Sequence, residues 1–465
     1  MSTSATLDHA RPEWGVRQER ERRHRRAKSR LRLPFAVAAA SEAVLLLWWL
    51  AAYPAFTAGD PDGSAPLYAA AVRWTTRLTG TTGTITLLQT FAVAFALGYL
   101  TAALARFGVR GRYTGPVALA LAALPPTGGF VVSLTPQVAY TAGVLMLSGV
   151  GLRLLVRRSE GTLHRGGPAQ RLDLAALFAA VLVLALTGTR GAGTALVAVA
   201  VLLLFLPRVR ARLALLTAVA LAVPIALGLF GHPASHAGDL HTLRAADLAL
   251  AYHRDPTQFT PAQRTVLAAV APLTAWDAAG ADCSSTAALT ARWGEAAAAR
   301  RGPQLAEIWQ QLLRDHPDRV LDARLCRGRL AWGVWAGTAD QHAETLVAPA
   351  DPDSRGLFAP LHSVATWSTT LLRAPQLDWI LWRGALWAYL GLAAAVLYAW
   401  RHRLAAIVPV AGAALLGVQL ALTASAANQD YRTMAPALFL GPLLLTLATV
   451  RSGGPNQGLG ELRGE

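Results

Sequence analysis

The chain has 465 residues, 54% of them hydrophobic and 15% charged, and its formal net charge is +16. Its mean hydropathy of +0.36 averages long Ala/Leu/Val runs with one polar stretch, and apolar runs of roughly 18 residues or more indicate membrane helices. This composition argues against a soluble protein. We expect an all-α polytopic membrane protein of about ten transmembrane helices with a helical exterior domain.

Ten apolar runs are predicted as spans: 34–52, 84–105, 115–126, 136–155, 172–188, 191–206, 212–231, 381–400, 404–424 and 432–449. The third is short and ends at Pro125-Pro126, which predicts a broken or tilted helix. These runs divide the chain into a basic cytoplasmic tail (1–33), an N-terminal bundle (34–232) with a first outer loop (53–83), an extracytoplasmic helical domain (233–380), C-terminal transmembrane helices (381–450) and a disordered cytoplasmic tail (451–465).

The positive charge follows the membrane topology. Arginines gather between every second pair of spans, so that each cluster falls on the same side when ten spans are threaded in order. This is the positive-inside pattern, which predicts a multi-pass protein of the plasma membrane with both termini in the cytoplasm. The charge therefore does not indicate a nucleic-acid partner. Lys28 is the only lysine, and the Arg and Ala bias indicates a GC-rich bacterial genome.

The exterior domain is predicted to be helical. Its expected helices are 239–252, 260–273, 303–314 and 318–335, and no β alternation of useful length occurs. Thr260, Pro261 and Gln263 form a helix-start signature. The run 356–372 is expected to be a re-entrant or surface helix. In the first outer loop, 65–78 has helical spacing and fits either an interfacial helix or an ordinary loop helix.

Cys283 and Cys326 both fall in the segment that the charge rule assigns to the exterior. Cysteines in an oxidising compartment can form a disulfide, so this pair is a disulfide candidate. Two free thiols are the alternative.

Two acids, Asp60 and Asp62, follow the first span directly. Charged groups near hydrocarbon are costly, so a carboxylate at the membrane boundary is a functional candidate. The alternative is structural, because Gly59-Asp60-Pro61-Asp62-Gly63 is also a good turn sequence.

Five stretches, taken in chain order, resemble a bacterial branch of polytopic membrane glycosyltransferases related to the GT-C superfamily. They are Tyr53-Pro54-Ala55 through Asp60; Leu134 to Tyr140, where a Trp-Lys-Asp-Val-Pro-Phe run often opens a span; Thr189-Arg190-Gly191-Ala192-Gly193, in place of an Arg-Asn-Asn-Gly motif; Trp309 through His316-Pro317 to Ala323; and Asp430-Tyr431-Arg432 with Pro436. Such enzymes transfer a sugar from a polyprenyl-phosphate donor to a cell-envelope glycan, lipid or protein acceptor at the outer face of the membrane.

The resemblance implies that Asp60 is the catalytic base. Asp62 is expected to support it or to bind a divalent cation, Mg²⁺ or Mn²⁺. Arg190, Arg432 and Gln137 are the expected donor-binding residues, since a guanidinium suits phosphate oxygens. These arginines could instead lie against lipid headgroups or pair with Asp430.

His316, Asp430 and Tyr431 are expected either to contact the acceptor or to be structural. Several tryptophans of the exterior domain could line an acceptor groove, but most Trp in helical domains is core material.

The chain also departs from the family pattern. Gln137 replaces the acidic member of the second motif, Pro136 replaces its Lys, and the Asn pair after Arg190 is absent. A catalytically inactive relative is therefore one alternative. An oligosaccharide polymerase or ligase is another, in which His316 would matter more than Asp60. A transporter or flippase is the third, and it is disfavoured because the spans contain almost no ionisable residue.

Overall fold

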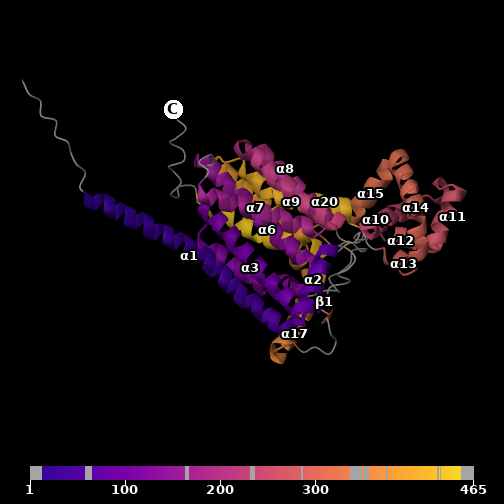
Figure 1. The fold of residues 1–465 in the computed structure, drawn as a ribbon, viewed down its shortest axis with the longest axis horizontal. Coiled ribbons are helices and arrows are strands. Elements are labelled where there is room, and N and C mark those ends of the chain that lie inside the picture. Colours follow the sequence, from indigo (N-terminus) through magenta and orange to yellow (C-terminus); the bar gives the residue numbers. More distant parts are fainter. Residues whose placement is uncertain are drawn as a thin grey trace, which may run out of the picture.

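The computed structural model describes residues 13–57, 65–162, 167–230, 236–283, 286–335, 348–349, 356–372, 375–426, 429 and 431–451. These residues form a helical bundle and a smaller helical unit at one end of it (Figure 1). The all-α, polytopic architecture agrees with the prediction from the sequence.

The bundle consists of α1 (Glu13–Ala52), α3 (Gly83–Arg106), α4 (Gly111–Ala123), α5 (Pro125–Val131), α6 (Pro136–Ser159), α7 (Pro168–Leu186), α8 (Thr189–Phe205), α9 (Arg210–Phe230), α19 (Gly384–His402), α20 (Ile407–Ser425) and α21 (Ala435–Leu445), with the 3-10 turns η1 (Pro207–Val209), η4 (Tyr431–Met434) and η5 (Thr446–Thr449). Among the described residues, 7 helices are long and apolar enough to cross a membrane, or up to 8 if a bent pair counts as one span. Ten spans are not confirmed. The predicted span 191–206 corresponds to α8, a shorter helix of 17 residues. The predicted span 381–400 corresponds to α19, whose tryptophans, tyrosines and terminal Arg-His pair lower the mean hydropathy of the helix.

The bent pair is α4 and α5, which meet at an angle of 69°. Leu124 is extended between them, and Pro125 and Pro126 open α5. A residue before proline avoids the helical region, and proline itself has no N–H to continue α4. The predicted break at this position is confirmed.

Arginine-bearing helix ends lie together at one end of the bundle. Tyr398 of α19 donates to the carbonyl of Phe107 after α3 (3.1 Å), and Arg401 donates to the carbonyl of Ala448 in η5 (2.9 Å). Arg158 of α6 donates to the carbonyl of Phe205, where α8 ends. We call this the arginine-rich end, and we call the opposite end, which carries the smaller helical unit, the domain end.

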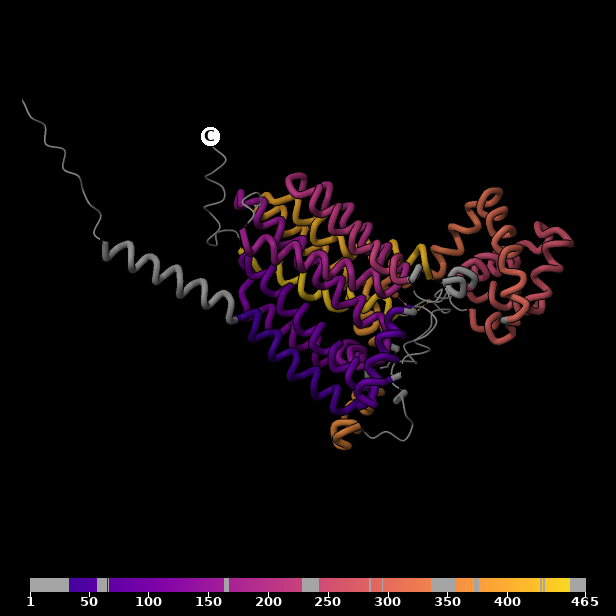
Figure 2. Tube along the Cα trace, in the orientation of Figure 1, coloured from indigo at the N-terminus to yellow at the C-terminus, as the bar shows by residue number. Residues whose placement is uncertain are grey.

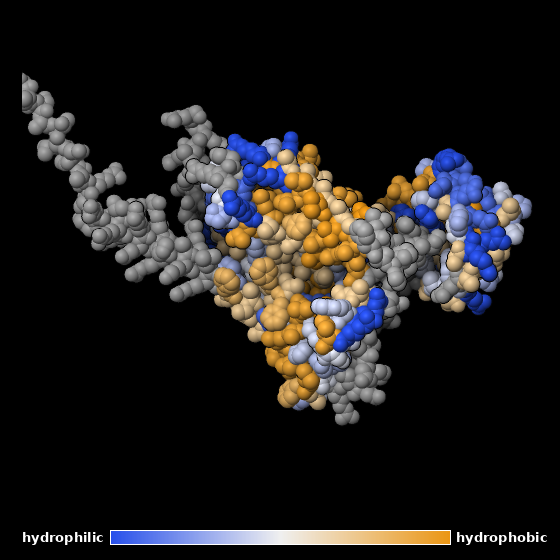
Figure 3. Space-filling view, in the orientation of Figure 1, coloured by the Kyte–Doolittle hydropathy of each residue, from blue (hydrophilic) through white to orange (hydrophobic). Residues whose placement is uncertain are grey.

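The surface between the two ends is apolar. Figure 3 shows a hydrophobic band over the bundle, with hydrophilic residues gathered toward its ends and over the smaller unit. Large exposed side chains of this surface include Phe91, Phe95, Leu196, Leu204 and Leu215. Exposed apolar area of this extent is expected where lipid surrounds a protein.

Glycines allow the bundle helices to approach closely. A Cβ at Gly98 of α3 would lie 2.8 Å from the carbonyl oxygen of Pro34 in α1, and one at Gly417 of α20 would lie 2.6 Å from the carbonyl oxygen of Thr194 in α8. Small residues at helix contacts are typical of membrane bundles, where van der Waals packing drives association.

The unit at the domain end contains α10 (His236–Arg254), η2 (Pro256–Gln258), α11 (Pro261–Val270), α12 (Leu273–Ala281), α13 (Ala287–Thr290), α14 (Glu295–Asp315), α15 (Pro317–Arg327) and α16 (Arg329–Trp332). It has its own apolar core, in which Trp276 is fully buried. The capping box of Thr260 and Gln263 is present, as predicted. The prediction that a helix begins at Pro303 was wrong, because α14 starts eight residues earlier and includes this proline.

After this unit the chain returns to the bundle, where α17 (Ala359–Leu372) lies against α1 (Figure 2). His362 Nδ1 is 2.9 Å from the carbonyl oxygen of Ala51, and the Leu357 amide donates to the carbonyl of Leu50 (2.9 Å). The chain then passes through η3 (Pro375–Leu377) and α18 (Asp378–Leu381) into α19.

A three-stranded sheet joins distant segments near α17. Its order is β2-β1-β3, formed by β1 (Phe56–Thr57), β2 (Ser133–Leu134) and β3 (Ala348–Pro349). β1 is parallel to β2, with Phe56 opposite Ser133, and antiparallel to β3, with Phe56 opposite Pro349. No strand was predicted, because two-residue strands carry no readable alternation.

Candidate functional site

The sheet at the domain end brings two of the predicted motifs together. β1 leads into the acidic loop, and β2 leads into the stretch that contains Gln137. Asp60 and Asp62 themselves lie outside the described residues, so the role of Asp60 as catalytic base stays a prediction. Thr57, three residues before Asp60, is paired with Leu134, three residues before Gln137.

A buried polar group lies beside this sheet. Gln89 of α3 donates through Nε2 to the hydroxyl of Tyr68 (2.9 Å) and to the carbonyl of Thr135 (3.1 Å). Tyr68 belongs to α2 (Pro66–Thr79), where a helix was predicted over 65–78. Burial raises the pKa of the Tyr68 hydroxyl, against the opposing hydrogen bond from Gln89, so this hydroxyl stays protonated. Gln137 Oε1 accepts from the Thr135 hydroxyl.

The same level of the bundle contains Arg190, at the start of α8. The Tyr140 hydroxyl of α6 lies 2.9 Å from the Thr194 hydroxyl of α8. Gln137 precedes Tyr140 by three residues and Arg190 precedes Thr194 by four, and residues at these spacings share a helix face. Because both helices run from the domain end, Gln137 and Arg190 each lie about one turn outward from this hydroxyl pair.

Three arginines converge on the end of α20. Arg324 donates to the carbonyl of Ala424, Arg190 donates through Nε to the hydroxyl of Ser425 (3.1 Å), and Arg327 donates through Nε to the carbonyl of Ala426 (2.9 Å). The last carbonyls of a helix have no partner within it and carry the negative end of its dipole, so cations are stabilised there.

One buried carboxylate neutralises two of these arginines only in part. Asp247 of α10 is 1% exposed, accepts from Arg324 (2.7 and 3.0 Å) and pairs with Arg327. Burial lowers the pKa of Arg327, although Asp247 opposes this shift. Arg190 is half-buried and has no ion pair among the described residues. Its charge is therefore one that the described carboxylates leave unmatched at this end of the bundle.

The motif from Trp309 to Ala323 has a structural role here. Trp309 donates through Nε1 to Asp247 (2.9 Å), and the Arg244 guanidinium lies 5.5 Å from the centre of its ring. Ala323 is fully buried, and His316 is exposed where α14 meets α15. Its predicted role in acceptor binding stays a prediction.

The motif before α21 is described in part. Tyr431 is buried and its ring packs edge-on against Trp382, with centroids 5.3 Å apart. Arg432 is half-buried, and Asp430 lies outside the described residues. A pairing of Arg190 or Arg432 with Asp430, one of the predicted alternatives, is therefore not described.

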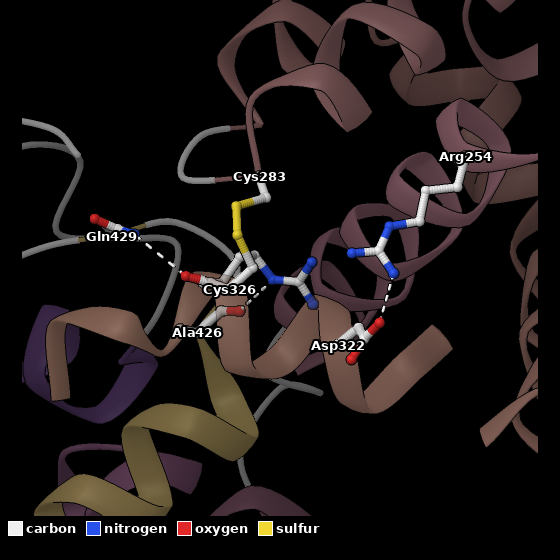
Figure 4. The surroundings of a disulfide bond; sticks show 7 residues. Arg254, Cys283, Asp322, Cys326, Ala426 and Gln429 are labelled. Atoms are coloured by element: carbon white, nitrogen blue, oxygen red, sulfur yellow. Dashed lines mark hydrogen bonds and ion pairs between the residues drawn. A yellow bond between two sulfur atoms is a disulfide. The ribbon is translucent and has the colours of Figure 1, made fainter. Parts of the chain in front are cut away.

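Cys283 and Cys326 form the predicted disulfide, with a Cα–Cα distance of 6.2 Å (Figure 4). The bond joins the end of α12 to α15. Gln429 donates to the carbonyl of Cys326 (3.4 Å), and Arg254 forms an ion pair with Asp322 (2.6 Å). The disulfide thus lies beside the contact between the helical unit and the end of α20.

Two buried acids in the bundle were missed. Glu42 of α1 is 8% exposed and Asp173 of α7 is fully buried. Asp173 pairs with Arg153 (2.6 Å) and Arg157 (2.7 Å) and accepts from Tyr99 (3.0 Å). The argument that the spans hold almost no ionisable group was therefore wrong, and a single Glu inside the apolar run 34–52 was the readable signal.

The described residues contain no group of three or more His, Cys, Asp or Glu side chains that could hold a metal ion. No family model, curated protein or solved structure matches the chain. Its function is therefore argued from the geometry of the domain end.

Proposed function

We propose that this protein is a membrane glycosyltransferase that moves a sugar from a polyprenyl-phosphate donor to a cell-envelope acceptor. The observation that carries the proposal is Arg190, a half-buried guanidinium at the domain end with one hydrogen bond to Ser425 and no ion pair among the described residues. A planar guanidinium at the membrane boundary suits the phosphate of a lipid-linked donor.

The proposed reaction uses Asp60 of the first outer loop and Arg190 at the start of α8. An acceptor hydroxyl attacks the anomeric carbon of the donor sugar and gives its proton to the Asp60 carboxylate. The bond between that carbon and the phosphate oxygen breaks, and the electron pair leaves with the phosphate, which Arg190 stabilises. The pairing of β1 with β2 supports this assignment, because it holds the segment before Asp60 beside the segment before Gln137.

The proposal includes a ten-span topology in which α8 and α19 also cross the membrane. The clustering of Arg106, Arg158, Arg208, Arg401 and Arg451 toward one end of the bundle supports a cytoplasmic assignment of that end. The domain end then faces the exterior of a bacterial plasma membrane, where a disulfide is stable.

Sugar transfer in membrane vesicles tests the proposal, with a panel of polyprenyl-phosphate sugars as donors. We expect Asp60→Asn to lower the rate roughly 10²- to 10⁴-fold, as loss of a general base does. Arg190→Gln should lower it roughly 10²-fold, as loss of an electrostatic stabiliser does. Asp315→Asn, an exposed acid at the end of α14, is the control for the acid, and Arg212→Gln, at the arginine-rich end, is the control for the cation.

The outcomes distinguish an error in the proposed site from an error in the proposed class of enzyme. Transfer that survives both Asp60→Asn and Arg190→Gln would reject this site but keep the class. A folded wild-type protein that transfers sugar from no donor would reject the class.

Glu42 favours a second candidate, a transporter or flippase, because intramembrane acids mark substrate and proton pathways in such proteins. Movement of a lipid-linked sugar between leaflets without transfer to an acceptor would support this candidate. The same vesicles report both activities.

A further inference from the structure

Glu42 lies deep in the first span. It is the tenth of the 20 residues of the segment Leu33–Ala52, which puts it about 15 Å from either end of this helical segment. The side chain is directed into the contact between α1 and α3, and the residue is only 8% exposed. An acid at this depth is rare and functional by default.

Its two oxygens have different surroundings. Oε1 lies 2.9 Å from the Thr90 hydroxyl oxygen, which in turn lies 2.7 Å from the carbonyl oxygen of Leu87. Oε2 is enclosed by the protein and has no hydrogen-bond partner. No ion pair reaches Glu42 from any described residue.

The charged and titratable groups on the helices packed against α1 are Tyr99 and Arg106 on α3, Arg112 and Tyr113 on α4 with Arg110 before it, and His362 on α17, while α5 has none. Tyr99 bonds to Asp173, Arg112 bonds to Tyr113, and His362 contacts Ala51. These groups are therefore engaged elsewhere or lie at helix ends.

The Thr90 contacts indicate which group carries the proton. A hydroxyl has one hydrogen to donate, so it cannot donate fully to both Leu87 and Glu42. Both short contacts are satisfied when Thr90 donates to the carbonyl of Leu87 and a protonated Glu42 donates through Oε1 to Thr90. An ionised carboxylate would instead be buried with at most one hydrogen bond, from Thr90, and with no paired cation among the described residues, which is strongly unfavourable.

We infer that Glu42 is a proton-binding site in the interior of the membrane. Its ligand is a proton, because the second oxygen is closed to solvent and no described Lys, Arg or His side chain forms an ion pair with the carboxyl. Thr90 is the acceptor that holds this proton. The inference does not depend on the glycosyltransferase proposal.

Infrared spectroscopy of the full chain in lipid vesicles at neutral pH tests this. A protonated carboxyl has a C=O stretching band separate from those of carboxylates and amides. We expect this band in the wild type, its shift to lower wavenumber when glutamate is labelled with ¹³C at the side-chain carboxyl, and its loss in Glu42→Gln. Asp173→Asn is the matched control, because Asp173 is equally buried but paired with two arginines and so ionised.

The absence of a protonated-carboxyl band in the wild type would overturn the inference, and so would a band that ignores the glutamate label. Neither readout needs a variant, so a failure of Glu42→Gln to fold leaves the test intact. Thr90→Val removes the acceptor at nearly constant shape and should move the band to higher wavenumber. A band that Thr90→Val leaves unchanged would also count against the assignment.

Discussion

Removal of the Asp247 carboxylate should weaken the contact between the helical unit and the bundle. Asp247 is the counter-charge of Arg324 and Arg327, which also bond to the end of α20 through the carbonyls of Ala424 and Ala426. In Asp247→Ala, both guanidinium groups keep their helix-end contacts but lose their carboxylate. The contact between the two parts of the molecule then carries two unpaired positive charges.

The expected magnitude follows from burial. Side-chain exposure is 2% for Arg327, 14% for Arg324 and 0% for Asp247, and breaking a buried ion pair by removing one partner costs about 3–5 kcal/mol. Trp309 also loses the acceptor of its indole N–H, worth about 1–3 kcal/mol for a buried donor. These costs share one carboxylate and do not add in full, so we expect a loss of at least about 3 kcal/mol.

Guanidinium unfolding in a mild detergent, followed by tryptophan emission, measures this loss. The matched control is Asp277→Ala, whose carboxylate is 60% exposed and contacts His253 at 2.9 Å. An exposed pair of this kind contributes about 1 kcal/mol or less. Equal destabilisation by Asp247→Ala and Asp277→Ala would refute the reasoning.

Three further predictions concern the same unit. Reduction of Cys283–Cys326, which closes a separation of 43 residues, should lower its unfolding free energy by about 4 kcal/mol in a guanidinium titration. The Thr257 hydroxyl and amide lower the pKa of Asp255 below its usual 3.8. The stability that this shift contributes is present above that value and is lost as the pH falls through the folded-state pKa. Acid unfolding of Asp255→Asn should lack this loss of stability. Gly328→Ala would set a Cβ 2.8 Å from backbone atoms of α15 and α20, and should cost about 1–3 kcal/mol in the same guanidinium assay.

Each of these has a control with a distinct outcome. The unfolding free energy of the double variant Cys283→Ser/Cys326→Ser should not change when reductant is added. A reductant effect that persists in this variant would mean that the disulfide is not its cause. The exposed acid Asp315→Asn should leave the acid dependence unchanged. At Gly193 the nearest atom to an added Cβ is 3.6 Å away, so Gly193→Ala should be tolerated, and a similar loss there would contradict the steric reason given for Gly328.

Features of the fold that depend on local chemistry were predictable from the sequence. Long apolar runs identified most of the spans because bilayer thickness fixes their length. Pro125-Pro126 located the bend between α4 and α5, and Thr260 with Gln263 located the start of α11. Pro303 misled because it lies in the interior of α14, eight residues after the helix begins, where proline is normally disfavoured, and the polar residues before it gave no sign of a helix.

The contacts that join the two parts of the molecule were not predictable in this way. Arg324 and Asp247 are 77 positions apart in sequence, and Arg327 reaches Ala426 across 99. No local pattern encodes such pairs, because they depend on how α10, α15 and α20 meet. For the same reason the sequence left the Trp309–His316 motif open between acceptor binding and a structural role, and Trp309 bonds to the carboxylate that neutralises this contact.

The two buried acids of the bundle differ in charge state because they differ in partners. Asp173 is flanked by Arg153 and Arg157, so its ionised form is stabilised by two cations and the group acts as a structural link between α6 and α7. Glu42 is almost equally buried but faces a threonine hydroxyl, so only its neutral form fits. Burial alone therefore does not identify a functional acid. The identity of the nearest partner separates an acid that holds helices together as a carboxylate from one that holds a proton, and of the two acids Glu42 is the one that holds a proton.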